Sequence, residues 1–491
     1  MGFSALDYVV VAAYLAGITW FGTRFRQGQR TMADYFIGAR NTPWWVIGLS
    51  IVATETSTLT LIGVPAIAFG TPARPEQGGN FTYLQVVLGY LIARLIISWL
   101  FIPAYFKDEM FTAYELINRR FGSAAKHVMA TLFLAMRPLA EGVRVFAASL
   151  VMAAVLSASL PSLPHLWLWS IVIVGVLTLV YTFEGGITAV IWTDLIQLVI
   201  YIGGSLLAAY ELLHLVPGGW TTIVAEASAA HKLQVWSFSR DIHVPFTFWA
   251  GLAGGTCLTM ASHGTDQLLV QRLLTCKNAG DSKKALMLSG VVVFGQFALF
   301  LLIGVMLFVY YHFNALPPMT TNDQVFPAFI VRSLPHGVSG LVIAAIFAAA
   351  MSNLSGSLNS LASTSMFDVY LPLTGKRPDE ATLLSMSRWL TAAWGLVLIG
   401  IAMLARGWGS VFTTGLTIAS IVYGPMLGAF LLGLLTTRAN QAGAITGTVI
   451  SLASMIAVKL FTEVAWTWYV LIGAVVCMTV GYAVSITTEK G

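Results

Sequence analysis

Long apolar runs separated by short polar stretches repeat along almost the whole chain. A helix that crosses a bilayer needs about 20 mostly apolar residues. By this measure the pattern predicts about 13 membrane-spanning segments, at roughly 6–25, 43–70, 80–106, 124–157, 165–183, 187–216, 244–264, 283–313, 337–362, 384–406, 411–436, 440–461 and 465–486. Several runs are longer than a bilayer requires, and we expect those helices to be tilted, broken or continued outside the membrane.

Composition points to the same class of protein. Of 491 residues, 57% are hydrophobic and 10% are charged, whereas soluble domains carry about 25% charged residues. These values exclude a disordered chain and an ordinary soluble enzyme. The longest polar stretch, about 217–243, is too short to fold alone, so the sequence predicts one membrane domain over 1–491. The three cysteines are isolated and show no spacing typical of disulfide frameworks, zinc sites or thiol nucleophiles.

The distribution of basic residues predicts the orientation of the chain. The formal charge of +5 would suit a nucleic-acid-binding protein, but Lys and Arg lie in short loops between apolar runs, as is typical of membrane proteins. With the N-terminus outside, 17 of the 26 basic residues fall in inside loops, 6 in outside loops and 3 within apolar segments. We therefore expect a protein that lies in the lipid bilayer with its N-terminus outside and its C-terminus inside, and that does not bind nucleic acid. The first segment lacks a basic n-region and a cleavage site, which predicts a retained helix rather than a signal peptide.

Three clusters of small and hydroxyl-bearing residues interrupt the apolar segments. They lie at 53–60, at 254–256 together with 262–264, and at 349–357. Non-helical backbone at membrane depth is tolerated only where it is buried or lines a cavity, so such clusters indicate a site. Interruptions in the second and seventh segments, five apart, are typical of inverted-repeat secondary transporters. The alternative for a single cluster is close packing of helices through small residues.

Charged residues inside apolar segments are a second indication of a site. Glu55, Glu141, Arg144 and Asp194 lie in such stretches, and each costs about 2.5–3.5 kcal/mol near the centre of a membrane helix. Glu141 and Arg144 are spaced to form an i,i+3 ion pair, which is the structural alternative for these two. The structural alternative for Asp194 is a place near the cytosolic interface, and His263 is equally consistent with a packing role.

The chemistry of these clusters favours an alkali cation. Hydroxyls, free carbonyls and a carboxylate are hard oxygen ligands, whereas a transition metal prefers imidazole or thiolate. A broken helix also presents carbonyl ends to a cation and amide ends to an anionic or polar solute group. The sequence therefore predicts a site for a cation and a polar solute near the middle of the membrane.

Motifs along nearly the whole chain resemble the sodium/solute symporter family, which includes bacterial sialic acid and proline transporters and sodium–glucose cotransporters. The motifs are Asp34-Tyr35-Phe36, Gly48-Leu49-Ser50, Thr182-Phe183-Glu184-Gly185-Gly186-Ile187, Trp192-Thr193-Asp194-Leu195-Ile196-Gln197, Asp266-Gln267-Leu268-Leu269-Val270-Gln271-Arg272, Ala344-Ala345-Ile346-Phe347-Ala348-Ala349-Ala350-Met351-Ser352, Gly424-Pro425 and Arg438-Ala439-Asn440. The resemblance implies a leucine-transporter-type inverted repeat of five plus five helices. Repeat one would cover about 43–216 and repeat two about 244–436, with peripheral helices at 6–25, 440–461 and 465–486.

The resemblance also implies where sodium binds. The family's shared sodium site would use Ala53, Thr56, Ala349, Ser352 and Asn353. Asn353 departs from the Ser or Thr usual in the family, but an amide oxygen is a suitable ligand for a hard cation. A second sodium site, known in some members, would use Asp194, Ser352 and Ser355, and this chain has Gly356 where a further hydroxyl would be expected.

For the solute, the resemblance places a polar set of residues around the break in the second segment. The set is Glu55, Ser57, Thr60, Gln85, Glu141, Arg144, Thr259 and His263. Arg144 matches an arginine that binds a carboxylate in sialic acid carriers, whereas an acid at position 55 is similar to the proline carrier. Glu55 and Arg144 would clamp a zwitterion or pair with each other, so sugar, sugar acid and amino acid all stay open.

The leading hypothesis is a sodium-coupled symporter that imports a small polar organic solute by alternating access. It would act in the inner or plasma membrane, as a monomer, with sodium as the coupled ion. A membrane enzyme using His263 is one alternative, but the sequence offers no nucleophile–base pair or metal cluster for it. A channel is another alternative, and it would need a continuous polar pore.

Overall fold

All secondary structure in the described part of the chain is helical. The computed structural model describes residues 4–70, 79–108, 110–159, 165–319, 321–375, 378–405, 408 and 411–488. Within these residues, nine helices are long and apolar enough to cross a membrane, and one bent pair of helices adds a tenth. Each of the predicted segments contains a described helix. The all-helical membrane class is thus as predicted from the sequence, while the number of crossings stays a prediction.

The helices have the following bounds in chain order. They are α1 (Ala5–Thr23), α2 (Met32–Ile37), α3 (Trp44–Glu55), α4 (Thr58–Phe69), α5 (Leu84–Tyr105), α6 (Tyr114–Phe121), α7 (Ser123–Ser159), α8 (Leu166–Leu215), α9 (Gly219–Ala229), the π-helix η4 (Ala250–Gly255), α10 (Thr256–Gly264), α11 (Gln267–Leu274), α12 (Ala279–Phe313), α13 (Val325–Ser333), α14 (Val338–Thr364), α15 (Leu371–Thr374), α16 (Glu380–Leu404), α17 (Val411–Leu435), α18 (Gln441–Phe461) and α19 (Tyr469–Thr488).

Two of the predicted segments, 165–183 and 187–216, lie within α8. Its 50 residues would extend about 75 Å if straight, more than twice the thickness of a hydrocarbon core. Gly186 interrupts it with non-helical torsions (φ 54°, ψ −155°). A Cβ atom there would approach the carbonyl oxygen of Tyr35 to 2.6 Å, so both the torsions and the packing require glycine.

The breaks predicted in the second and seventh segments differ in form. α3 ends at Glu55 and α4 begins at Thr58, with a bend of 62° between them. In the seventh segment a π-helix precedes α10, and α11 begins after the N-cap Asp266. The third cluster, 349–357, lies in α14 without a break, and its small residues let this helix pack closely on its neighbours.

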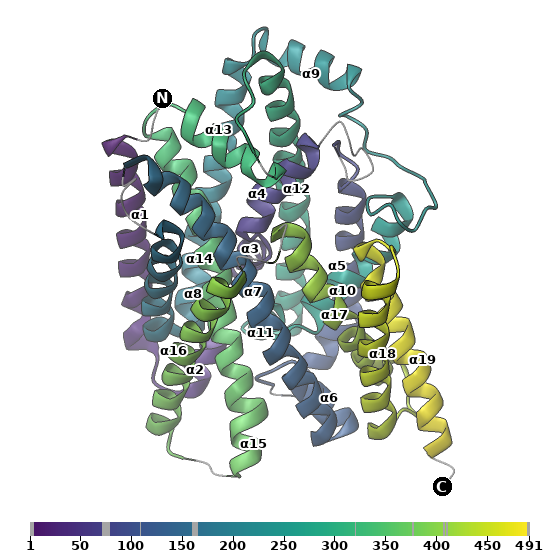
Figure 1. The fold of residues 1–491 in the computed structure, drawn as a ribbon. Helices are drawn as coiled ribbons and strands as arrows, with labels where there is room; N and C mark the ends of the chain where they lie inside the picture. The colour runs from purple at the N-terminus through teal and green to yellow at the C-terminus, as the bar shows by residue number, and fades with distance from the viewer. Residues whose placement is uncertain are drawn as a thin grey trace.

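The most buried of the candidate spans is α14, which packs against α8, α7, α1 and α3. Figure 1 shows α17, α18 and α19 together at one side of the bundle, where they contact one another. It also shows that α1 begins at the end occupied by α9 and α13, whereas α19 finishes at the opposite end. Five basic residues that entered the loop count lie outside the described residues, namely Arg74, Lys376, Arg377, Arg406 and Lys490.

Asp7 ties α1 to the start of α14. Its Oδ1 accepts backbone hydrogen bonds from Gly337 (2.7 Å) and Gly340 (2.8 Å) and one from the hydroxyl of Ser339 (2.7 Å). A carboxylate at a helix N-terminus satisfies free amides and complements the helix dipole. The helix that precedes the predicted repeats is therefore fixed to the central helix.

Candidate functional site

A cavity of about 100 Å³ lies at the break between α3 and α4. Six of the eight predicted solute-binding residues line it, contributed by α3, α4, α7, α10 and the bend at Ser57: Glu55, Ser57, Thr60, Arg144, Thr259 and His263. Tyr83, Tyr90, Phe297 and Tyr423 add aromatic rings to the wall. The cavity therefore combines both signs of charge, hydroxyls and aromatic faces, a combination typical of small-molecule sites.

Glu55 forms its ion pair with Arg94 of α5. The guanidinium of the fully buried Arg94 donates to Oε2 of Glu55, and Nε2 of His263 lies 3.3 Å from the same oxygen. Arg94 is held in place by Ser289, which accepts from its Nε at 3.1 Å. The suggested pair between Glu55 and Arg144 is therefore not formed, because Arg94 occupies that role.

Gln85 and Glu141 are not among the residues that line the cavity. The Gln85 amide donates to the carbonyls of Thr82 (3.1 Å) and Phe246 (3.2 Å), and its oxygen accepts from the amide of Ser237 (3.0 Å). These bonds tie the start of α5 to the segment before η4. Glu141 is fully buried, so neither predicted solute-binding residue lines the cavity in this structure.

Glu141 and Arg144 form the i,i+3 pair expected from their spacing. Nη1 of Arg144 lies 3.2 Å from Oε2 of Glu141, and the same oxygen accepts from Arg137 at 3.0 Å. Among the described residues, Nε of Arg144 has no hydrogen-bond partner although it is buried. An unpaired buried donor is costly, so this guanidinium retains capacity for an acceptor on a ligand.

Asn353 connects the arginines with the broken helix. Its Oδ1 accepts from Arg137 (3.1 Å) and Arg144 (3.2 Å), while its Nδ2 donates to the carbonyl of Thr54 (2.5 Å). Two guanidinium groups already surround this amide oxygen. A cation ligated by the same oxygen would meet their positive charge, so the structure favours a role for Asn353 in orienting the arginines.

The other predicted sodium ligands lie where α3 ends beside α14. The last four carbonyls of a helix have no partner within it, and Ala53 is one of these residues because α3 ends at Glu55. The Thr56 hydroxyl donates to Val52 (2.8 Å) and accepts from Gln296 (2.5 Å). Across the contact between α3 and α14, Ala349 and Ser352 are fully buried. This arrangement offers oxygen ligands to a small hard cation.

The residues of the second predicted sodium site surround Asp194 only in part. The hydroxyl of Ser352 donates to Oδ1 of Asp194 at 2.6 Å. The hydroxyl of Ser355 instead donates to the carbonyl of Ser352 in its own helix at 3.0 Å. Arg272 reaches Oδ2 of Asp194 at 2.9 Å, a contact that the sequence reasoning missed.

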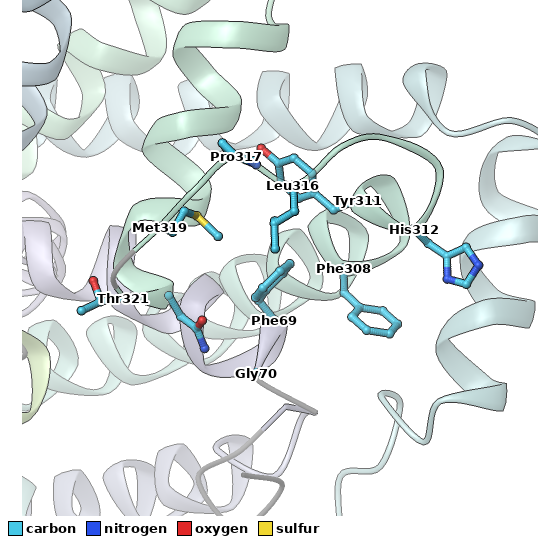
Figure 2. A pocket seen from close by; sticks show the side chains of 10 residues that line it. Phe69, Gly70, Phe308, Tyr311, His312, Leu316, Pro317, Met319 and Thr321 are labelled. Atoms are coloured by element: carbon cyan, nitrogen blue, oxygen red, sulfur yellow. The ribbon is translucent and has the colours of Figure 1, made fainter. Parts of the chain in front are cut away.

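A larger cavity of about 470 Å³ lies where α4 and α12 end (Figure 2). Its wall is mostly aromatic and apolar, with Phe69, Phe308, Tyr311, Leu316 and Met319. The described residues that line it include no Asp, Glu, Lys or Arg. It therefore lacks the charged groups that would orient a polar solute, and the smaller cavity is the better candidate site.

Three arginines form ion pairs with candidate site residues, but the sequence analysis predicted no role for them: Arg94, Arg137 and Arg272. A signal for the first two was present, because both lie within apolar segments and a buried cation needs a partner. Their partners are 39 and 4 positions away, and only the second spacing is one that a single helix brings together. Arg272 stands within a family motif, but its side-chain partner comes from α8.

Comparison with known proteins relates the whole chain to one group. A sequence model described as "Sodium:solute symporter family" matches residues 35–451. The sodium/sialic acid symporter NanT of Aliivibrio fischeri is 29% identical over 489 residues, covering 98% of this chain and 93% of that protein. The human sodium/iodide cotransporter is 28% identical over 480 residues, covering 95% of this chain and 71% of its own. The structure of a Na⁺-coupled sialic acid symporter, described as substrate-bound, outward-open and revealing a novel Na⁺ site, is similar with a TM-score of 0.88 at 27% identity, covering 99% of this chain and 98% of the other.

Proposed function

The chain belongs to the sodium:solute symporter family, and we propose that its solute is a small organic anion with a carboxylate group. It is a sodium-coupled membrane symporter and not an enzyme. Of the three solute classes that the sequence left open, the proposal keeps sugar acids and amino acids and excludes neutral sugars.

The proposal rests on the hydrogen bonding of Arg144 and on its exposure at the cavity. Its Nε lacks a partner among the described residues, and 16% of its side chain is exposed at the cavity. A guanidinium binds a carboxylate through two parallel charge-assisted hydrogen bonds. Related proteins named for sialic acid and for iodide also carry anions, which supports an anionic solute here.

The remaining polar groups of the cavity suit the rest of such a solute. Ser57, Thr60 and Thr259 bear hydroxyls that both donate and accept hydrogen bonds. The second carboxylate oxygen of Glu55 is not engaged by Arg94 or His263, so it is available to a solute hydroxyl or ammonium. Glu55 thus favours a hydroxylated or zwitterionic carboxylate over a purely apolar one.

For sodium, we propose the site formed by α3 and α14. The carbonyls of Ala53, Thr56 and Ala349 and the hydroxyl of Ser352 are its ligands, and Asn353 connects it with the arginines of the cavity. Sodium bound there holds the broken helix in the form that completes the solute cavity, so each ligand raises the affinity of the other by the same factor.

The architecture proposed for this function is the five-plus-five inverted repeat, over about 43–216 and 244–436. The two repeats rock about the central site to expose it to either side in turn. The orientation is N-out, C-in in the inner or plasma membrane, and the working unit is a monomer that binds no nucleic acid. A channel is the competing mechanism, and only a carrier supports exchange of labelled for unlabelled solute without a driving gradient.

A thermal-shift screen on the purified protein tests the solute class. Sialic acid, its methyl ester, a neutral hexose and proline are each added with sodium or with potassium. A solute that binds the native state raises the melting temperature by mass action.

We expect a solute with a free carboxylate to raise the melting temperature in sodium but not in potassium. This rise should be absent with the methyl ester and absent in the variant Arg144→Gln. Arg240→Gln, at an exposed site, is the matched control. Equal stabilisation by the ester or the hexose would contradict the proposal.

A further inference from the structure

The short helix α11 lies between the candidate solute cavity and a loop that is inside in the proposed orientation. Leu268 and Leu269 of this helix line the cavity, and all eight residues of α11 are buried. After Leu274 the chain enters the loop before α12, which belongs to the predicted inside loops. A movement of α11 would therefore open the cavity toward that side of the membrane.

Asp266 attaches the start of α11 to two other helices. Its Oδ1 accepts from the backbone amide of Leu268 at 2.8 Å, which makes it the N-cap of α11. Its Oδ2 accepts from the hydroxyl of Tyr423 in α17 (2.5 Å) and from Nη1 of Arg137 in α7 (3.5 Å). Asp266 is buried and is not among the residues that line the cavity. It can therefore respond to the solute only through its neighbours.

Arg137 connects this carboxylate with the arginine proposed to bind the solute. Nη2 of Arg137 donates to Oε2 of Glu141 (3.0 Å) and to Oδ1 of Asn353 (3.1 Å). Nη1 of Arg144 donates to the same two oxygens, at 3.2 Å each. The two guanidinium groups share their acceptors, so a ligand that draws Arg144 away leaves both oxygens to Arg137.

The charges of this cluster are balanced before any solute binds. Arg137 and Arg144 carry two positive charges, and Glu141 and Asp266 carry two negative charges. Only Arg144 is partly exposed, and the other three residues are buried. A solute carboxylate on Arg144 adds a third negative charge, which competes for the positive charge that holds the two acids. The ion pair most easily lost is the longest one, between Arg137 and Asp266.

We infer that Arg137 is a positioning residue that transmits the binding of a carboxylate at Arg144 to Asp266, so that the start of α11 is released only when solute is present. The inference rests on the proposed binding of the solute by Arg144. As Arg144 turns toward the solute, Arg137 shifts toward Glu141 and Asn353 and gives up Asp266. With the cavity empty, the contact holds α11 in place, and sodium alone does not cross.

Influx of radioactive sodium into proteoliposomes in the absence of solute tests the inference. Asp266→Asn keeps a residue suited to the N-cap but removes the charge that attracts Arg137, so α11 should be released without solute. The loss of a hydrogen bond to a charged group shifts an equilibrium by roughly tenfold or more. We therefore expect solute-free sodium influx to rise roughly tenfold over the wild type. Asp379→Asn, at the exposed N-cap of α16, is the matched control and should leave the influx unchanged.

Tyr423→Phe supplies a second, independent variant. It removes the hydrogen bond between α17 and Asp266, so it should also raise the solute-free influx. Tyr482→Phe, at an exposed site in α19, should not. A melting transition shows which variants are folded, and a purely structural role of these contacts would lower the melting temperature without a sodium leak.

The outcomes separate the inference from the proposed function. Solute-free influx at the wild-type level, in whichever of Asp266→Asn and Tyr423→Phe is folded, would overturn the inference and leave the symport intact. In the wild type, sialic acid or another carboxylate found in the thermal-shift screen should raise the sodium influx. If no such solute raises it, the proposed function itself is wrong.

Discussion

Ser352 and Asn353 are neighbours on α14 whose side chains have different partners. Ser352 donates to Asp194 beside the proposed sodium ligands, whereas Asn353 holds Arg137 and Arg144. We predict that Ser352→Ala abolishes the sodium-dependent rise in melting temperature, because it removes a cation ligand. Asn353→Ser should keep sodium affinity at or above the wild-type value, and sodium titration of both variants measures the contrast.

Solute affinity separates the two variants further. Asn353→Ser deletes the amide oxygen that orients the arginines, and a hydrogen bond to a charged group is worth about 1.5–3 kcal/mol, or roughly 10- to 150-fold in affinity. We expect that loss for a carboxylate solute at saturating sodium. A wild-type sodium response in Ser352→Ala would show that the sodium site lies elsewhere.

Glu55 is predicted to serve the solute and not sodium. Adjacent residues on a helix diverge by about 100°, and the side chain of Glu55 faces the cavity and Arg94. Glu55→Gln should leave sodium affinity within a few-fold but weaken solute binding by about 1.5–3 kcal/mol, the value of a hydrogen bond to a charged group. That is roughly 10- to 150-fold in affinity, measured by solute titration at saturating sodium.

The ion pair with Arg94 supplies the control for Glu55→Gln. Removing one partner of a buried pair leaves the other unpaired and destabilises a protein by about 3–5 kcal/mol. The single variant should therefore melt earlier, and Glu55→Gln/Arg94→Gln should recover much of that loss. Collapse of sodium affinity in Glu55→Gln, with unchanged solute affinity at saturating sodium, would assign this carboxylate to the cation.

At the scale of elements, Lys232 binds the carbonyls at the C-terminal end of α4. Its ammonium donates to the carbonyls of Phe69 (2.5 Å) and Ala68 (3.3 Å) and lies 4.2 Å from the ring centre of Phe308. We predict that Lys232→Met lowers the melting temperature, since buried carbonyls left without donors cost about 1–3 kcal/mol. Lys459→Met, at an exposed position, should be neutral in the same measurement.

The same lysine predicts a pH dependence with a definite sign. Burial lowers the pKa of Lys232 to about 8, whereas an unfolded lysine has a pKa of about 10.4. Between these values the folded protein binds fewer protons than the unfolded chain, so stability rises with pH. The difference in melting temperature between wild type and Lys232→Met should be constant below pH 8 and grow from about pH 8 to 10. A difference that shrinks over this range would contradict the expectation.

The helices could be predicted from the sequence better than the side-chain contacts between them. The hydroxyls between Thr54 and Thr60 predicted the break after α3, because polar backbone at membrane depth needs a site to line. The partner of Glu55 was not predictable in the same way. Arg94 lies in another helix, and no periodic pattern specifies which faces of two helices meet. The interruption of α8 at Gly186, by contrast, coincides with the boundary predicted between the apolar segments 165–183 and 187–216.

At the scale of the whole molecule, the proposed orientation in the membrane predicts which loops can be labelled from outside the cell. The excess of basic residues on one side predicts that position 30 faces the cytosol. A cysteine introduced by Arg30→Cys should react with a membrane-impermeant maleimide only after the cells are opened. Arg240→Cys, in a predicted outside loop, should react in intact cells. Labelling of position 30 from outside would reverse the proposed orientation.

The most direct test of the account is uptake of a labelled carboxylate solute into proteoliposomes. Vesicles containing the wild-type protein are diluted into sodium or potassium buffer, with Arg144→Gln and Arg240→Gln vesicles in parallel. The account predicts concentrative uptake only under an inward sodium gradient, lost in Arg144→Gln and retained in Arg240→Gln. Uptake of equal extent in potassium, or undiminished uptake by Arg144→Gln, would contradict the central claim that sodium drives the entry of a carboxylate held by Arg144.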